Sequence, residues 1–238
     1  MNMLTVSNLT RYFGGLAAVV DLSFTVDQGE VVGLIGPNGA GKTTVFNMLS
    51  GFFPPSSGEI IYQDHKINGL KPHQVCDLGL TRTFQVVQPF PDMTVLENTM
   101  IGAYVRHPNT TDAKKKALET LERVDLHTKA DKLGRDLTLL ELKRLEIGKA
   151  LASEPNLLML DEVAAGLKDT EIEDILTLVR QLNQEGMTLL IVEHLMKVIM
   201  NLSHRIIVLD FGKMIAQGTP QEISQHPAVL EAYLGKDE

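Results

Sequence analysis

A glycine-rich segment between an apolar run and a helical run constrains the fold of this chain more than any other feature. The segment reads Gly36-Pro37-Asn38-Gly39-Ala40-Gly41-Lys42-Thr43 and matches the pattern G-x-x-x-x-G-K-[ST]. The apolar residues 31–35 precede it, and a helical pattern over residues 44–50 follows it. A strand, a tight turn and a helix in this order are typical of a layered α/β fold.

The same segment has the chemistry of a phosphate-binding loop. Glycines let the backbone turn so that several N–H groups point at one anion, and the start of a helix adds a partial positive charge there. Lys42 would reach the β- and γ-phosphates, and the Thr43 hydroxyl would bind Mg²⁺. We therefore predict that residues 36–43, with Thr44, bind a nucleoside triphosphate. The alternative is a glycine-rich turn that binds nothing.

A second apolar run, residues 157–160, ends in the acids Asp161 and Glu162. In open α/β sheets, ligands bind in the crevice beyond the carboxyl ends of the strands. We expect Asp161 to hold Mg²⁺ through water, and Glu162 to act as general base or to position the attacking water. Without the glycine-rich segment, two solvated acids at a strand end would be the simpler interpretation.

Strand-like and helical patterns alternate along the chain, which predicts an α/β architecture. The stretch from about 87 to 152 differs, because it has a helical pattern and no convincing strand; it predicts a helical insertion. The N-terminal quarter predicts an added antiparallel β layer. A helix is expected over residues 170–184, where apolar residues recur at helical spacing. The expected strands are residues 4–8, 22–26, 31–35, 59–62, 157–160, 188–192 and 206–209.

Composition excludes several classes of protein. The chain has 238 residues and a net charge of −8, which argues against a nucleic acid as partner. Hydrophobic residues make up 44 %, as in ordinary globular proteins. Cys76 is the only cysteine, so an internal disulfide is excluded. The sequence has neither a run of about 18 apolar residues nor the pattern of a secretory signal.

With these motifs placed, the chain resembles the ATP-binding subunits of ABC transporters over almost its whole length. Within them it is most similar to the ATPases of branched-chain (hydrophobic) amino-acid importers. The narrower likeness rests on Arg11-Tyr12-Phe13-Gly14-Gly15-Leu16, Arg82-Thr83-Phe84-Gln85, Leu145-Glu146-Ile147, Gly218-Thr219-Pro220 and Glu231-Ala232-Tyr233-Leu234-Gly235. The resemblance implies one ATP-binding domain with a P-loop NTPase (RecA-like) core, an antiparallel β layer and an inserted helical subdomain. The core and β layer would span about 1–86 and 153–238, and the subdomain about 87–152.

The resemblance also implies roles for three further residues. Phe13 matches the aromatic residue that stacks on adenine; Tyr12 next to it is an alternative, and a buried core aromatic is the structural alternative for both. Gln85 matches the glutamine that touches Mg²⁺ or water and moves with the transmembrane partner. His194 matches the histidine that hydrogen-bonds the γ-phosphate.

The implied activity is ATP hydrolysis that drives solute import. The implied partners are a homologous ATPase subunit, in a homodimer or heterodimer with two ATP molecules between the subunits, transmembrane permease subunits and, indirectly, a periplasmic solute-binding protein. The chain would then be peripheral on the cytoplasmic face of the inner membrane. Two alternatives stay open: the ATPase of a lipopolysaccharide-type exporter, and a soluble P-loop protein that uses ATP as a switch.

One segment departs from the family pattern. The helix that usually opens with Leu-Ser-Gly-Gly-Gln reads Leu137-Thr138-Leu139-Leu140-Glu141 here. In the family, this segment covers the ATP of the opposite subunit, and its glycines let backbone N–H groups approach the γ-phosphate. Leucines at both positions should hinder that approach. Thr138 and Glu141 still have the spacing of a capping box, which predicts a helix start at this point.

Overall fold

The computed structural model describes residues 2–85 and 89–234. Its centre is a six-stranded sheet in the order β10-β9-β3-β8-β7-β6. All neighbouring pairs are parallel except β10 and β9, which are antiparallel. The strands β3, β7 and β8 are buried along their whole length, as expected for a parallel sheet that is covered on both faces. The bounds are β3 (Val31–Ile35), β6 (Leu80–Arg82), β7 (Leu157–Asp161), β8 (Thr188–Val192), β9 (Arg205–Asp210) and β10 (Lys213–Gly218).

A second, antiparallel sheet has the strand order β2-β1-β4-β5. It consists of β1 (Asn2–Phe13), β2 (Leu16–Asp27), β4 (Ser57–Tyr62) and β5 (His65–Lys66). The predicted β layer is therefore present, with strands longer than expected from the apolar runs. The sequence patterns missed β5, β6 and β10, because β5 and β6 are only two and three residues long and the apolar run of β10 is short and ends in polar residues on both sides.

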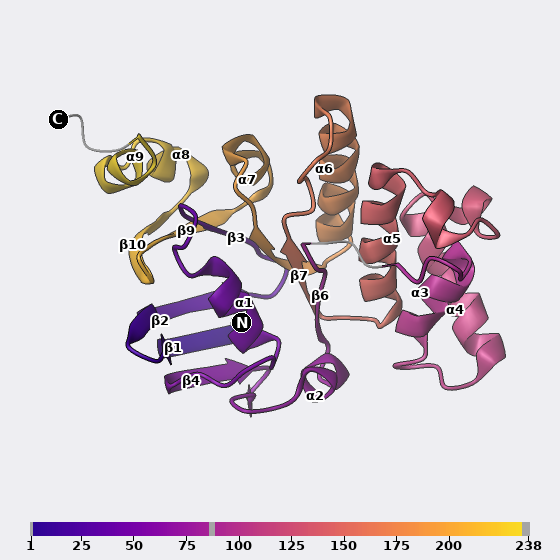
Figure 1. Ribbon diagram of the computed structural model, residues 1–238, viewed down its shortest axis with the longest axis horizontal. Helices are drawn as coiled ribbons and strands as arrows, with labels where there is room; N and C mark the ends of the chain where they lie inside the picture. Colours follow the sequence, from indigo (N-terminus) through magenta and orange to yellow (C-terminus); the bar gives the residue numbers. More distant parts are fainter. Residues whose placement is uncertain (1, 86–88, 235–238) are drawn as a thin grey trace.

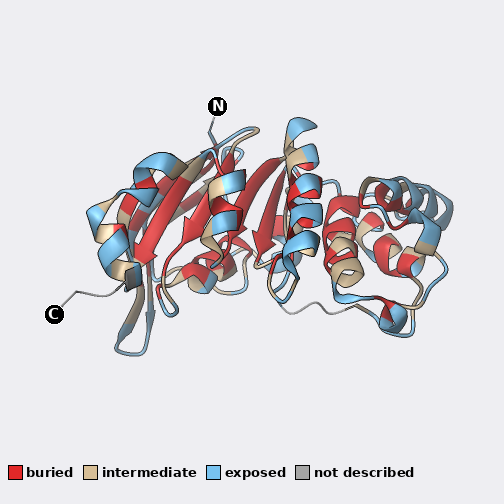
Figure 2. Ribbon diagram, turned by 90° about the horizontal axis from the view of Figure 1, so that it is seen from above, coloured by how far each residue is buried: buried red, intermediate tan, exposed pale blue. Residues whose placement is uncertain are grey.

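The core lies on both faces of the six-stranded sheet (Figure 2). Val32 and Leu34 face the antiparallel sheet, and α1 (Lys42–Leu49) places Phe46 and Leu49 in the same cluster. Val31 and Ile35, on the opposite face, pack with α6 (Asp169–Gln184) and α7 (Met196–Leu202). The helix predicted over 170–184 is therefore confirmed as α6. The helix α1 starts at Lys42, two residues before the predicted start.

Helical segments form one end of the molecule, opposite α8 (Pro220–Ser224) and α9 (Pro227–Leu234) (Figure 1). The helix α5 packs against α3 and α4, and its Leu145 and Ile147 also join the core of the six-stranded sheet. The predicted boundary at residues 86 and 87 and the predicted motif residue Gly235 lie outside the described residues. The segments at this end are α3 (Val95–Ala103), α4 (Thr110–Arg123), η1 (His127–Lys129), η2 (Gly134–Asp136) and α5 (Leu139–Ala152); the short helix α2 (Pro72–Asp77) precedes β6.

In the ranges 2–85 and 89–234, we find no helix that combines the length and the apolar character needed to cross a bilayer.

Candidate functional site

The glycine-rich segment forms the turn between β3 and α1, and two of its positions require glycine. Gly36 has φ +154°, and a Cβ there would lie 2.1 Å from the carbonyl oxygen of Leu209. Gly41 caps α1 with φ +101°, and a Cβ there would lie 2.5 Å from the carbonyl oxygen of Ala18. The turn is therefore packed tightly between β9 and β2, which fixes its backbone.

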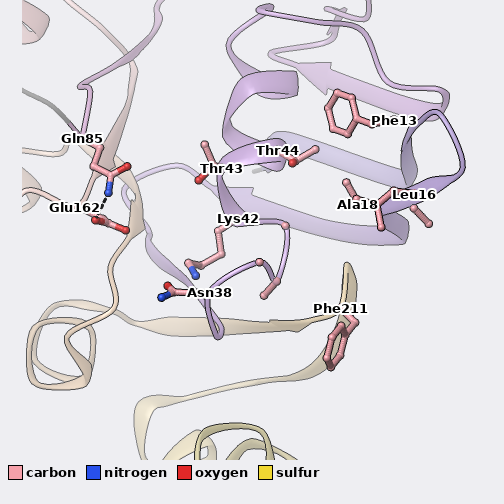
Figure 3. Close-up of a pocket in the computed structure, with 14 residues that line it drawn as sticks. Phe13, Leu16, Ala18, Asn38, Lys42, Thr43, Thr44, Gln85, Glu162 and Phe211 are labelled. Carbon is pink, nitrogen blue, oxygen red and sulfur yellow. Dashed lines mark hydrogen bonds between the residues drawn. The ribbon is translucent and has the colours of Figure 1, made fainter.

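A cavity of about 490 Å³ opens over this turn (Figure 3), a size typical of small-molecule sites. The turn and the start of α1 form its floor, the β1–β2 hairpin and Phe211 form one side, and two polar residues close the other. The lining residues are Phe13, Leu16, Ala17, Ala18, Asn38, Gly39, Ala40, Gly41, Lys42, Thr43, Thr44, Gln85, Glu162 and Phe211.

Lys42 places its ammonium group inside the turn. Its Nζ donates to the carbonyl oxygens of Gly36 at 2.7 Å and Pro37 at 3.0 Å. Burial lowers the pKa of Lys42, and the carboxylates of Glu162 and Asp161 oppose that change. The site therefore presents a cation at its floor, with the exposed Thr43 beside it.

Asp161 lies at the end of β7 and is buried. Its Oδ2 accepts a hydrogen bond from Arg82 Nη2 at 2.9 Å, and its backbone N–H donates to Thr83 Oγ1. Burial raises the pKa of Asp161, and the Arg82 guanidinium opposes that rise. Arg82 also donates to Asn47 Oδ1 and Ser50 Oγ near the end of α1. This arginine thus connects the helix of the glycine-rich turn to Asp161, a contact that the sequence patterns did not predict.

Gln85 and Glu162 meet at the side of the cavity (Figure 3). Gln85 Nε2 donates to Glu162 Oε2 at 2.7 Å. Glu162 has φ +48°, in the left-handed region that non-glycine residues rarely adopt. Its backbone N–H donates to the carbonyl oxygen of Val192 at 2.9 Å. The fold therefore brings together two residues that the sequence analysis singled out separately.

His194 follows β8 and lies next to this pair. Its Nδ1 is 3.8 Å from Glu162 Oε2, and its side chain is half exposed. His194 and Asp161 do not line the cavity as the structure describes it, whereas Gln85 and Glu162 do. Behind Glu162 lie two buried charged residues that the sequence analysis did not single out, Lys143 and Glu193. In the sequence, the only indication of these two residues is a charge at the end of an apolar run (Glu193) or among the apolar residues of a helical pattern (Lys143).

The structure distinguishes the two neighbouring aromatic residues. Phe13 lines the cavity, and Tyr12 is not among its lining residues. The exposed fractions are 43 % for Phe13 and 49 % for Tyr12, so neither is a core aromatic. The Phe13 ring packs edge-to-face on Phe53 at 5.4 Å, and the Arg11 guanidinium lies 4.7 Å from its centre. These contacts leave Phe13 accessible for stacking on a flat ligand.

The predicted capping box at the start of α5 is confirmed. Thr138 Oγ1 accepts from the backbone N–H of Glu141, and Glu141 Oε2 accepts from the backbone N–H of Thr138. The two leucines that follow Thr138 differ: Leu139 is 41 % exposed, whereas Leu140 packs against the core. Leu139 is therefore the more accessible of the two leucines to a second molecule.

The donors at this site are hard oxygen atoms of the kind that Mg²⁺ prefers. They are the Thr43 hydroxyl, the Gln85 amide oxygen and the carboxylates of Asp161 and Glu162. No cluster of three or more His, Cys, Asp and Glu side chains that could hold a metal occurs in the part of the chain that the structure describes. Mg²⁺ at phosphate sites typically takes one or two protein ligands and completes its shell with phosphates and water, so this donor set fits the ion.

Comparisons with known proteins agree on one family. Residues 19–165 match the family model described as "ABC transporter", and residues 213–238 match the model described as "Branched-chain amino acid ATP-binding cassette transporter". The chain is 40 % identical to the high-affinity branched-chain amino acid transport ATP-binding protein BraF of Pseudomonas aeruginosa, with 98 % of both chains covered.

The solved structures that are similar to this chain include ATP-binding cassettes of the same family. The ADP conformation of MJ1267, an ATP-binding cassette of an ABC transporter, superimposes with a TM-score of 0.90 at 31 % identity, over 99 % of this chain and 100 % of that one. The ATP-binding cassette MJ0796, solved as a dimer with ADP and Pi, reaches 0.82 at 26 % identity, over 92 % of this chain and 99 % of that one.

Proposed function

The chain belongs to the ABC transporter family of ATP-binding proteins, and on that premise we propose that it drives the import of branched-chain or other hydrophobic amino acids. It is the nucleotide-binding subunit of a transporter and an ATPase. The solute is the proposed part, and its support is the 40 % identity to BraF together with the match of residues 213–238 to the branched-chain family model.

The observation that best supports the catalytic assignment is the cavity with Lys42 at its floor and the Gln85–Glu162 pair at its side. In this proposal the N–H groups of the turn and Lys42 hold the phosphates, and Phe13 stacks on the adenine. Glu162 accepts the proton of the attacking water, while Gln85 holds the Glu162 carboxylate in place. His194, whose Nδ1 lies 3.8 Å from Glu162 Oε2, donates to the γ-phosphate.

We propose Mg²⁺ as the metal of this site. Thr43 and Gln85 would bind it directly, and Asp161 would bind it through water. Asp161 has one oxygen committed to Arg82, which leaves the other for that water. The ion would neutralise charge on the phosphates during the reaction.

The proposed assembly has two such ATPase subunits, two permease subunits and an external solute-binding protein. The dimeric cassette MJ0796 supports the pairing of ATPase subunits. We place the chain at the cytoplasmic face of the membrane through its permease partners. We also propose that α3 to α5 form a helical subdomain inserted into the α/β core.

The test is transport by the reconstituted complex. The chain is co-expressed with candidate permease subunits from the same genome, purified and placed in proteoliposomes with a candidate solute-binding protein. We expect leucine, isoleucine or valine to stimulate ATP hydrolysis and to accumulate inside. Movement of a lipid-linked polysaccharide in the outward direction would favour the exporter, and failure to co-purify with any membrane subunit would favour the soluble ATP switch.

A further inference from the structure

Two oppositely charged side chains are buried behind the Gln85–Glu162 pair. Lys143 comes from α5 and is 4 % exposed; Glu193 follows β8 and is 0 % exposed. Burying charges in this way costs free energy unless they are paired or hydrogen-bonded. Neither residue lines the cavity, so neither is explained by contact with a nucleotide.

Lys143 holds the main chain of both residues of the pair. Its Nζ donates to the carbonyl oxygen of Glu162 at 2.9 Å and to that of Gln85 at 3.3 Å. The side chains of the same two residues are joined at 2.7 Å. Gln85 and Glu162 are thus connected twice, once through their side chains and once through a single ammonium group.

Glu193 makes a hydrogen bond to the segment that follows Glu162. Its Oε1 accepts from the backbone N–H of Ala164 at 2.8 Å, two residues after Glu162. Its Oε2 has no hydrogen-bond partner among the described residues. Burial raises the pKa of Glu193 and lowers that of Lys143, and the charge of Glu193 opposes the change at Lys143. The cation that opposes the rise at Glu193 is His194, whose Nδ1 lies 4.0 Å from Glu193 Oε2, while Glu193 in turn favours the charged form of Lys143.

The segment around Glu162 needs such support because the backbone of Glu162 is strained. Glu162 has φ +48°, and a non-glycine residue in this region persists only where its surroundings hold it. The carbonyl oxygen held by Lys143 belongs to that same residue. If the ammonium moves, the carboxylate of Glu162 moves with the backbone that carries it.

We propose that Lys143 is a positioning residue that fixes Glu162 and Gln85 for catalysis and transmits movements of α5 to them. This inference rests on the proposed role of Glu162. Lys143 is the fifth residue of α5, whose capped start carries the exposed Leu139. A shift of that start, when a second subunit covers it, changes the position of the Lys143 ammonium relative to both carbonyl oxygens.

The experiment compares Lys143→Met, Lys143→Arg and the matched control Lys149→Met in the assembled transporter. Lys149 lies on the same helix but pairs with Glu146. The readouts are kcat, KM for ATP, calorimetric ATP affinity and melting temperature. We expect Lys143→Met to lower kcat roughly 10- to 100-fold, since misplacing a reacting group by about 1 Å can cost 10²-fold. ATP affinity should change less than about twofold, and Lys143→Arg should recover most of kcat.

An unchanged kcat in folded Lys143→Met would overturn the inference, as would an equal loss in Lys149→Met. If Lys143→Met does not fold, Lys143→Gln takes its place, because glutamine keeps a hydrogen-bond donor. The same loss of kcat is expected, with kcat expressed per ATP-binding site. Glu162→Gln is measured in parallel to separate the two proposals. Hydrolysis that survives in Glu162→Gln contradicts the proposed role of Glu162, on which this inference rests, whereas a normal Lys143 variant beside an inactive Glu162→Gln contradicts only the role of Lys143.

Discussion

Lys42 donates to two carbonyl oxygens of its own turn, so its ammonium is hydrogen-bonded within the loop. A phosphate that enters the cavity can replace these carbonyl contacts with stronger, charge-assisted ones. The backbone of the turn does not depend on this side chain, because Gly36 and Gly41 are fixed by packing against Leu209 and Ala18. Binding and folding are therefore separable at this residue.

Lys42→Ala should weaken MgATP binding roughly 10- to 100-fold, since a hydrogen bond to a charged group contributes about 1.5–3 kcal/mol. Hydrolysis should be lost. The melting temperature without nucleotide should change little, because the loop is built from backbone geometry. Isothermal titration calorimetry measures the affinity, and an unchanged Kd would mean that the loop does not bind the phosphates.

Sequence patterns identified the residues whose roles depend on local spacing. The glycine-rich turn, Asp161 and Glu162 stand next to apolar runs that predict where strands end. Arg82 and Lys143 could not be found in this way, because their partners lie 79 and 19 residues away and only the fold brings them together. Gln85 and His194 were expected only from family resemblance, and the structure places both within reach of Glu162.

At the scale of elements, long apolar or periodic segments were predictable and short edge strands were not. The strand Thr188–Val192 has the predicted bounds, because burial on both faces requires a continuous apolar run. The two-residue strand β5 has both residues exposed and leaves no such pattern. The capped start of α5 could also be predicted from the sequence, because Thr138 and Glu141 have the spacing of a capping box.

The start of α3 gives a pH-dependent prediction. Thr94 and Glu97 form a capping box there, and the backbone N–H and hydroxyl of Thr94 lower the pKa of Glu97 below 4.5. A lowered pKa in the folded state stabilises the fold above pH 4.5, and this contribution disappears as the pH falls through the folded-state value. Wild type should therefore exceed Glu97→Gln in urea midpoint at pH 7, and the difference should shrink below pH 4.5.

Urea denaturation of both proteins from pH 7 down to about pH 3 measures this difference, because the contribution of the charge is lost only as the pH falls through a folded-state pKa that lies below 4.5. Glutamine keeps a side-chain acceptor for the capping box, so the comparison isolates the charge. A difference of constant size across the range would show that the charge of Glu97 does not stabilise the helix start.

At the scale of the whole molecule, the departure at Leu139 predicts an asymmetric pair of ATP sites. If each site combines the phosphate loop of one subunit with the α5 start of the other, this chain supplies a complete loop but an obstructed helix start. Losing one well-placed donor to the reacting group costs roughly 2.7–4 kcal/mol, or 10²–10³ in rate, by analogy with oxyanion holes. A homodimer should then hydrolyse ATP slowly, and a heterodimer with a subunit that has the glycines should have one fast site.

Leu139→Gly should raise the steady-state hydrolysis of the purified chain alone. Changing Leu140 to glycine as well would also remove a core contact, so the single substitution is the cleaner test. Rapid hydrolysis by the unmodified homodimer would show that a leucine is tolerated at this position, and the asymmetry would be wrong.

The central claim is that Glu162 activates water at an ATP site built on Lys42. The most direct test is ATP turnover and ATP affinity of Glu162→Gln in the assembled transporter. Glutamine preserves the shape of the side chain but cannot accept the proton, and loss of a general base typically costs about 10²–10⁴ in rate. We predict turnover lower by that factor with ATP affinity unchanged. Turnover close to that of wild type would contradict the account.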